Sequence, residues 1–268
     1  SIQRNDFRGV THTGTTGSIE VDCFFANSAA AGSHTIADNT ITNLNVNTSG
    51  SVFLVRDSGN PPASPGFQSV TNNRIVGTFN KAQSGGQVIG LNSTAGGSAS
   101  TSFTQSNNNF SNVTVTGTTT GSCVMTQAFG VRTVEGNVCN NWVGGAGGGL
   151  TGIRLQGFTG GSAVTAKSNT ITNFSSGGTL IGIEVVGTAG TSIVRENTIN
   201  TFSTTNGNAT GLIVLTQSLA GNTGDATVTL NAISGLSTTG GQSPVGISLG
   251  SGAGAAGILD VSASQNVV

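Results

Sequence analysis

One alternation of polar and apolar residues recurs along the chain, and it is clearest in the segment Ser168-Asn169-Thr170-Ile171-Thr172-Asn173-Phe174. Aligning further copies on Asn169 gives a column of Asn residues spaced 28 to 35 residues apart: Asn5, Asn39, Asn73, Asn108, Asn137, Asn169, Asn197, Asn231 and Asn266. A repeat of this length predicts a solenoid, in which every copy contributes one coil.

The positions around each Asn keep a constant character, which predicts two strands of every coil. The residue two positions later is apolar: Phe7, Ile41, Ile75, Phe110, Cys139, Ile171, Ile199, Ile233 and Val268. The residue four positions later is mostly Gly or Asn, which tolerate a left-handed backbone, so we expect a corner there. An aliphatic residue usually stands three positions before the Asn and a hydroxyl residue one position earlier, as expected for a strand with one buried face.

A third strand is predicted between one such corner and the next coil. It contains the segments 52–55, 88–91, 152–155, 182–185, 211–214 and 246–249, and segments 23–26 and 123–126 fit the same frame. The sequence therefore predicts an all-β chain of about eight coils of 28–35 residues, with three short strands per coil and an internal ladder of the aligned Asn side chains. Stacked amides can satisfy one another from coil to coil.

The composition narrows the class of protein. Charged residues make up 7% of the 268 residues, the net charge is −1, and Gly is present 43 times. Clustered Lys and Arg are needed to bind phosphates, so nucleic acid is not expected as a partner. No apolar run approaches the roughly 20 residues that span a membrane.

The three cysteines fall into positions with a structural role in the repeat. Cys139 occupies the Ile/Phe column and is interpreted as a small buried apolar residue. Cys23 and Cys123 lie in the third strand about three coils apart, too far to bond to each other. We expect no disulfide framework in a chain of this length.

The repeat, as in Asn39-Thr40-Ile41-Thr42-Asn43, resembles the right-handed parallel β-helix of the pectate-lyase-like fold over the whole chain. Its Thr-, Asn- and Gly-rich composition is also similar to repeat regions of large secreted bacterial surface proteins and adhesins. The resemblance implies a triangular cross-section with an Asn ladder at one corner. Pectinolytic enzymes, phage tailspikes and adhesins share this fold, so the fold alone does not decide the function.

A search for catalytic groups gives no constellation. Glu20, Asp22, Arg56 and Asp57 form the densest charged group, but we place Asp22 and Asp57 at opposite ends of their face and interpret the group as surface ion pairs. Arg154 with Glu184, and Glu135 with Lys167, are predicted to pair across neighbouring coils on the outer surface.

The remaining candidates for chemistry are few. His12 and His34 each stand alone, without the spacing of a catalytic triad or a metal site. The single Trp, Trp142, falls in an inward column, and there is no Tyr to form a sugar platform. We therefore expect no catalytic, cofactor-binding or metal-binding residues, and no cofactor.

Thr40/Thr42 and Thr170/Thr172 suit an ice-binding face, although Arg74, Val76, Val138 and Asn140 interrupt the same columns. Six sequons, at Asn47, Asn92, Asn109, Asn112, Asn173 and Asn208, matter only on a glycosylating secretion route.

We expect residues 1–268 to form a single β-helix domain that is a segment of a longer solenoid, with a filament of stacked subunits as a variant. The predicted function is a non-catalytic structural module of an extracellular or cell-surface protein, a rigid stalk for adhesion or filament assembly. A polysaccharide lyase or glycoside hydrolase is the alternative, and an ice-binding solenoid the minor one. Expected partners are other copies or further coils, through open ends or lateral faces, and surface glycans.

Overall fold

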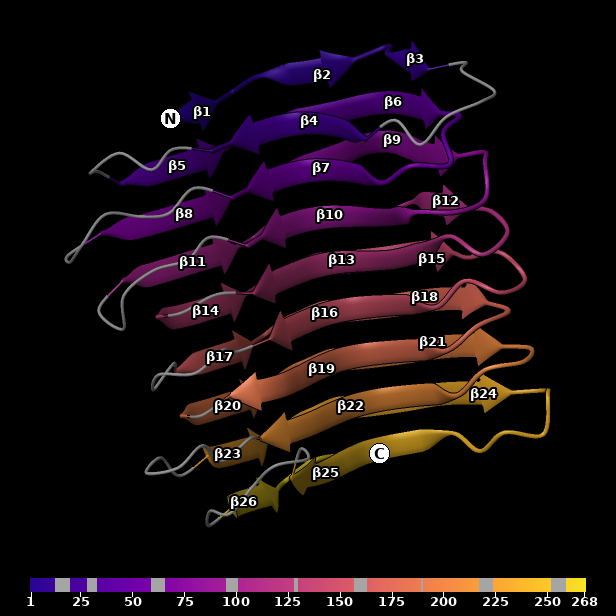
Figure 1. Ribbon diagram of the computed structural model, residues 1–268. Coiled ribbons are helices and arrows are strands. Elements are labelled where there is room, and N and C mark those ends of the chain that lie inside the picture. The colour runs from indigo at the N-terminus through magenta and orange to yellow at the C-terminus, as the bar shows by residue number, and fades with distance from the viewer. Residues whose placement is uncertain are drawn as a thin grey trace.

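The computed structural model describes residues 1–12, 20–27, 33–58, 66–94, 101–127, 130–156, 163–188, 190–216, 224–251 and 259–268. These residues form a parallel β-solenoid, with the strands stacked in three sheets along one axis (Figure 1). The described residues contain no helix. The prediction of an all-β parallel β-helix with three strands per coil is confirmed.

The three sheets are named here in chain order. Sheet 1 contains β1 (Ile2–Gln3), β5 (His34–Ala37), β8 (Phe67–Thr71), β11 (Ser102–Ser106), β14 (Val131–Glu135), β17 (Val164–Lys167), β20 (Thr191–Arg195), β23 (Gly224–Thr229) and β26 (Leu259–Ser264). Sheet 2 contains β2 (Asp6–Arg8), β6 (Thr40–Val46), β9 (Arg74–Lys81), β12 (Val113–Val115), β15 (Val138–Val143), β18 (Thr170–Ser176), β21 (Thr198–Thr204) and β24 (Ala232–Thr238), with β3 (Thr11–His12) also paired to β6. Sheet 3 contains β4 (Val21–Ala26), β7 (Val52–Asp57), β10 (Gln87–Ser93), β13 (Thr120–Gln127), β16 (Leu150–Gln156), β19 (Leu180–Thr188), β22 (Ala209–Thr216) and β25 (Val245–Ser251).

One coil consists of a strand from each sheet, and the coils are numbered from the N-terminus: coil 1 ends with β4, coil 2 with β7, and so on to coil 8, which ends with β25. Six of them, from β5–β7 to β20–β22, have a neighbour on both sides in all three sheets. The prediction of about eight coils is corrected to six complete ones, because the first described coil has a neighbour on one side only, and the last is stacked on both sides only at β23.

The Asn ladder runs through every described coil. Each ladder Asn donates from Nδ2 to Oδ1 of the next, and its backbone N–H donates to the same oxygen. Asn169, for example, donates from Nδ2 to Asn197 Oδ1 at 2.9 Å and to Val134 O at 3.0 Å. The seven ladder side chains from Asn39 to Asn231 are buried. Each buried amide of the ladder is therefore satisfied from a neighbouring coil, which is what allows a polar column inside the protein.

The predicted corner four positions after the ladder is confirmed by its backbone. All eight residues of this column have positive φ: Gly9, Asn43, Gly77, Asn112, Asn141, Asn173, Thr201 and Gly235. The residue after the corner packs inward, as with Leu44, Phe174 and Phe202, although Val10 in the first coil is exposed. In the third coil Phe79 takes the inward place, as predicted.

A second left-handed column was not predicted. The residue immediately before each ladder Asn also has positive φ: Arg4, Asp38, Asn72, Asn107, Gly136, Ser168, Glu196, Leu230 and Gln265. Its composition is mixed, so no residue type marked it in the sequence. A bulky residue such as Leu230 is uncommon in this region, and the hydrogen bonds of the Asn that follows hold the turn.

Candidate functional site

A shallow groove lies on the outer face of sheet 3, away from the two ends of the solenoid. It has a volume of about 290 Å³ and crosses β10, β13, β16 and β19. Two outward columns form its sides, Ser122–Thr151–Ile181 and Met125–Arg154–Glu184. Between them two consecutive residues of each strand face inward, as with Gly152 and Ile153, so the outer surface dips.

The charged side of the groove is an ion pair. Arg154 Nε lies 2.8 Å from Glu184 Oε2 on the neighbouring coil. Glu135 Oε1 lies 3.0 Å from Lys167 Nζ on the outer face of sheet 1. Both predicted pairs are confirmed, each on one face of adjacent coils. Glu184 is the one carboxylate among the described residues that line the groove.

The charged group at Arg56 differs in detail from the prediction. Arg56 pairs with Glu20 and lies 3.4 Å from Asp22, and its guanidinium stacks over the rings of Phe25 and Phe53. Asp22 lies within β4 rather than before it. Burial raises the pKa of Asp22, and Arg56 opposes that shift. The group is a local ion-pair cluster that covers an outward aromatic ring.

Asp57 does not belong to that cluster. It is the last residue of β7 and points into the solenoid, where it is buried. Its Oδ1 lies 3.6 Å from Nδ1 of His34, the first residue of β5, so the prediction that His34 stands alone is wrong. His12 is in β3, and its side chain lies outside the description.

A buried arginine faces the same interior corner. Arg132, in β14, is buried, donates to the hydroxyl of Thr126 and stacks 4.4 Å from the centroid of the Phe103 ring. Burial lowers the pKa of Arg132, and the negative charge of Asp57 raises it. We call the residues His34, Asp57, Gln68, Ser93, Phe103, Thr126 and Arg132 the polar corner.

The structure corrects the interpretation of the cysteines. Cys139 is buried in its apolar column, but it forms a disulfide with Cys123, with a Cα–Cα distance of 6.0 Å. Cys123 is in β13 of sheet 3 and Cys139 in β15 of sheet 2, and the repeat pattern along the chain does not indicate that these two columns face each other. Cys23 is a free thiol, and burial raises its pKa to about 12.

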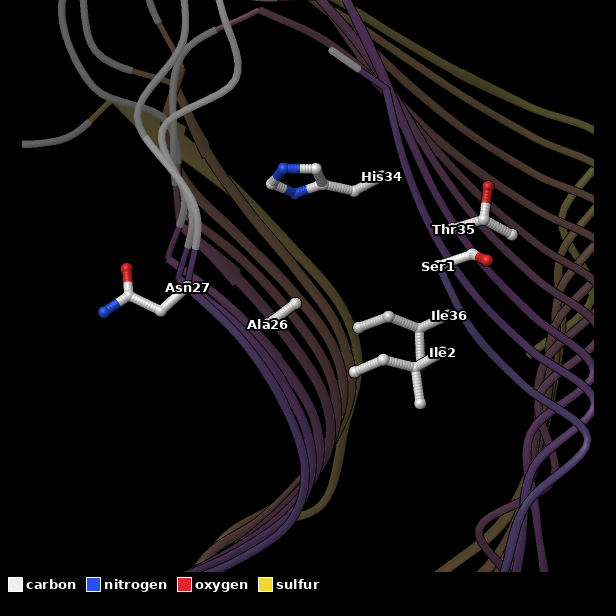
Figure 2. Close-up of a pocket in the computed structure, with 7 residues that line it drawn as sticks. All are labelled: Ser1, Ile2, Ala26, Asn27, His34, Thr35 and Ile36. Carbon is white, nitrogen blue, oxygen red and sulfur yellow. The ribbon is translucent and has the colours of Figure 1, made fainter. Parts of the chain in front are cut away.

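Two cavities lie at the ends of the described solenoid. The larger, about 310 Å³, lies between Ala26 and Asn27 on one side and Ser1 and Thr35 on the other (Figure 2). Ile2 and Ile36 lie one above the other and point toward Ala26, while the His34 ring lies above them in this view. The smaller, about 200 Å³, lies beside Ile233, Gly246 and Val268. Their apolar walls continue the core.

Other candidate sites receive less support from the described residues. No group of three or more His, Cys, Asp or Glu side chains that could hold a metal ion occurs among them. Within the same residues, no helix is long and apolar enough to cross a membrane. Trp142 is buried, as predicted from its inward column. Asn173 and Asn208 are the sequon residues of coils 6 and 7 and are exposed, whereas Asn92 is buried.

Comparison with known proteins adds no relative. No protein-family model matches the chain, and neither the curated proteins nor the solved structures contain a match.

Proposed function

We propose that this chain is a non-catalytic structural module of an extracellular or cell-surface protein, a rigid stalk that serves adhesion or filament assembly. The Asn ladder carries the proposal, because it continues from Asn5 to Asn266 with the same pair of hydrogen bonds at each step. Such a column couples each coil to the next and resists bending at any one junction.

The buried disulfide supports the proposed location. Cys123 and Cys139 are both buried and joined. Disulfides form and persist in oxidising compartments and are rare in the reducing cytosol. A secreted stalk would acquire this bond during export.

Stiffness can be measured directly. Residues 8 and 234 are outward residues of the same column, in coils 1 and 8, and are separated by seven coil steps. Fluorescent dyes attached at these two positions report the distance between them by energy transfer. At about 4.8 Å per step, we expect one narrow distribution of dye distances near 34 Å. The variant Asn137→Ala should broaden it. A broad distribution in the unaltered chain would contradict a stalk.

The alternative is a polysaccharide lyase or glycoside hydrolase, and the groove on sheet 3 favours it, because hydroxyl side chains and the Arg154–Glu184 pair line an open channel across four coils. Most glycosidases need two carboxylates flanking the bond. Turnover of acidic or neutral polysaccharides that is lost in Glu184→Gln, but kept in the matched variant Glu135→Gln, would replace the structural proposal with the enzymatic one.

A further inference from the structure

Sheet 2 is interrupted at β12, in coil 4: its pairing with β9 covers three residues, and its pairing with β15, across the junction between coils 4 and 5, is shorter still. β12 has three residues and pairs with β15 only through Val113 with Trp142 and Thr114 with Val143. The next junction, between β15 and β18, is paired from Val138–Thr170 to Val143–Ser175. Asn109, before β12, keeps isolated bridges to both neighbours.

The missing part of the ladder is replaced by side chains. In an unbroken parallel ladder the Asn140 N–H would donate to the Phe110 carbonyl. Here Asn140 N donates to the Ser111 hydroxyl at 3.2 Å, and the indole N–H of Trp142 donates to Phe110 O at 2.6 Å. The Asn140 N–H and the Phe110 carbonyl are both satisfied, but by the side chains of Ser111 and Trp142 instead of by each other.

The disulfide lies at this same junction. Cys123 occupies the sheet 3 column of Gly90, Gly152, Gly182 and Gly211. Each of these glycines packs closely against an apolar residue of the next coil, as Gly152 does against Ile171 and Gly182 against Ile199. At the junction between coils 4 and 5, Cys123 of coil 4 takes the place of the glycine and Cys139 of coil 5 takes the place of the apolar residue. Packing alone does not require cysteines here, because Gly with Ile fills the same space in other coils.

We propose that the Cys123–Cys139 disulfide is a redox-dependent latch that keeps the interrupted junction between coils 4 and 5 closed. With the bond formed, β13 and β15 are joined across the interior, and the junction opens rarely. With the bond reduced, sheets 1 and 3 stay paired across the junction. Sheet 2 is then held by the short β12 ladder, the backbone hydrogen bonds of Phe110 and Asn112, and the two side-chain hydrogen bonds. The latch would operate whatever the role of the whole chain.

The chemistry is thiol–disulfide exchange. The two thiols lose two protons and two electrons to a disulfide oxidant, which leaves as a dithiol. A dithiol reductant reverses the reaction, since its thiolate attacks one sulfur and a second thiolate resolves the mixed disulfide. Both cysteines are buried, so the reductant reaches them only when the junction opens.

Hydrogen–deuterium exchange tests the latch. We expect reduction with dithiothreitol to accelerate amide exchange at least about tenfold in 113–115 and 138–143, since these amides then exchange by local opening. Exchange in β21, two coils away, should not change. Unchanged exchange at the junction, or equal acceleration throughout, would overturn the proposal.

A matched variant separates the covalent bond from packing. Cys123→Gly with Cys139→Ile restores the pair found at Gly152 and Ile171. We expect its junction to exchange as fast as that of the reduced protein, with or without reductant. Exchange as slow as in the oxidised protein would show that the cysteines only fill space. If the variant does not fold, the comparison of the oxidised and the reduced unaltered protein still tests the proposal.

Discussion

The corner where sheet 3 passes into sheet 1 is polar in the coils nearer the N-terminus, called the upper coils here, and mainly apolar in those nearer the C-terminus, called the lower coils. In coils 2 to 5 it contains the polar corner, including Asp57, Gln68 and Arg132. In the same columns the later strands, from β16 and β17 onward, carry Leu155, Val185 and Val214 opposite Val164, Ser192 and Ala226, of which only Ser192 is polar. The strands keep one register through both regions. The Asn ladder and the sheets therefore fix the backbone, and the corner accepts a charge only where an opposite charge accompanies it.

The first and largest effect is expected from placing a charge in the apolar region. Val185→Asp puts a carboxylate in the column of Asp57, but next to Leu155 and Val214. Its described neighbours in the column are apolar and supply no cation, so we expect a loss of about 5 kcal/mol in the free energy of unfolding. Urea unfolding followed by circular dichroism measures it. The control Val185→Ala should lose about 2 kcal/mol, and equal losses would contradict the comparison.

The second prediction concerns what the two regions share. Asn73→Ala in the upper region and Asn197→Ala in the lower region each leave a neighbouring amide unpaired. We expect each to cost roughly 1–3 kcal/mol. The two losses should be alike, because the ladder bonds have nearly the same geometry. A much larger loss in one region, in the same urea experiment, would show that the ladder is not uniform.

The third prediction converts the polar corner into an apolar one. Asp57→Leu removes the negative charge that favours the buried guanidinium of Arg132. We expect a loss of about 1–2 kcal/mol, less than for a direct ion pair, because the two groups are on β7 and β14, with two coils between them. The double variant with Arg132→Met should recover most of it. Additive losses in this double-mutant cycle would refute the coupling.

The smallest effect concerns Cys23, in the upper region. Burial raises the pKa of the Cys23 thiol from 9.0 to about 12. At pH 8 the fraction present as thiolate is therefore roughly a thousandfold smaller than for a thiol with the ordinary pKa. We expect native protein to react with a disulfide reagent at least about a hundredfold more slowly than urea-unfolded protein, and stability to stay unchanged. Fast labelling at pH 8 would show that the thiol is accessible and ionised.

The repeat was readable because its signals are local. The Asn of the ladder, the apolar residue two positions later and the left-handed residue four positions later are close in sequence and recur in each coil. Both outer ion pairs followed from the same alignment, since residues in register on adjacent coils lie next to each other. The groove on sheet 3 was not predicted, because two consecutive inward residues, as in Gly152-Ile153, break the simple alternation of a strand.

The amino-acid sequence by itself determined the coil: which residues form the ladder, which columns face inward and where the chain turns. The tertiary structure alone decided which columns meet across the interior. Cys123 meets Cys139, and Asp57 meets His34, only because sheet 3 of one coil faces sheet 2 of the next and turns into sheet 1 at a shared corner. Alternation along a strand gives the side of the sheet on which a residue lies, but not its partner on another sheet, which depends on how the strands curve around a common core.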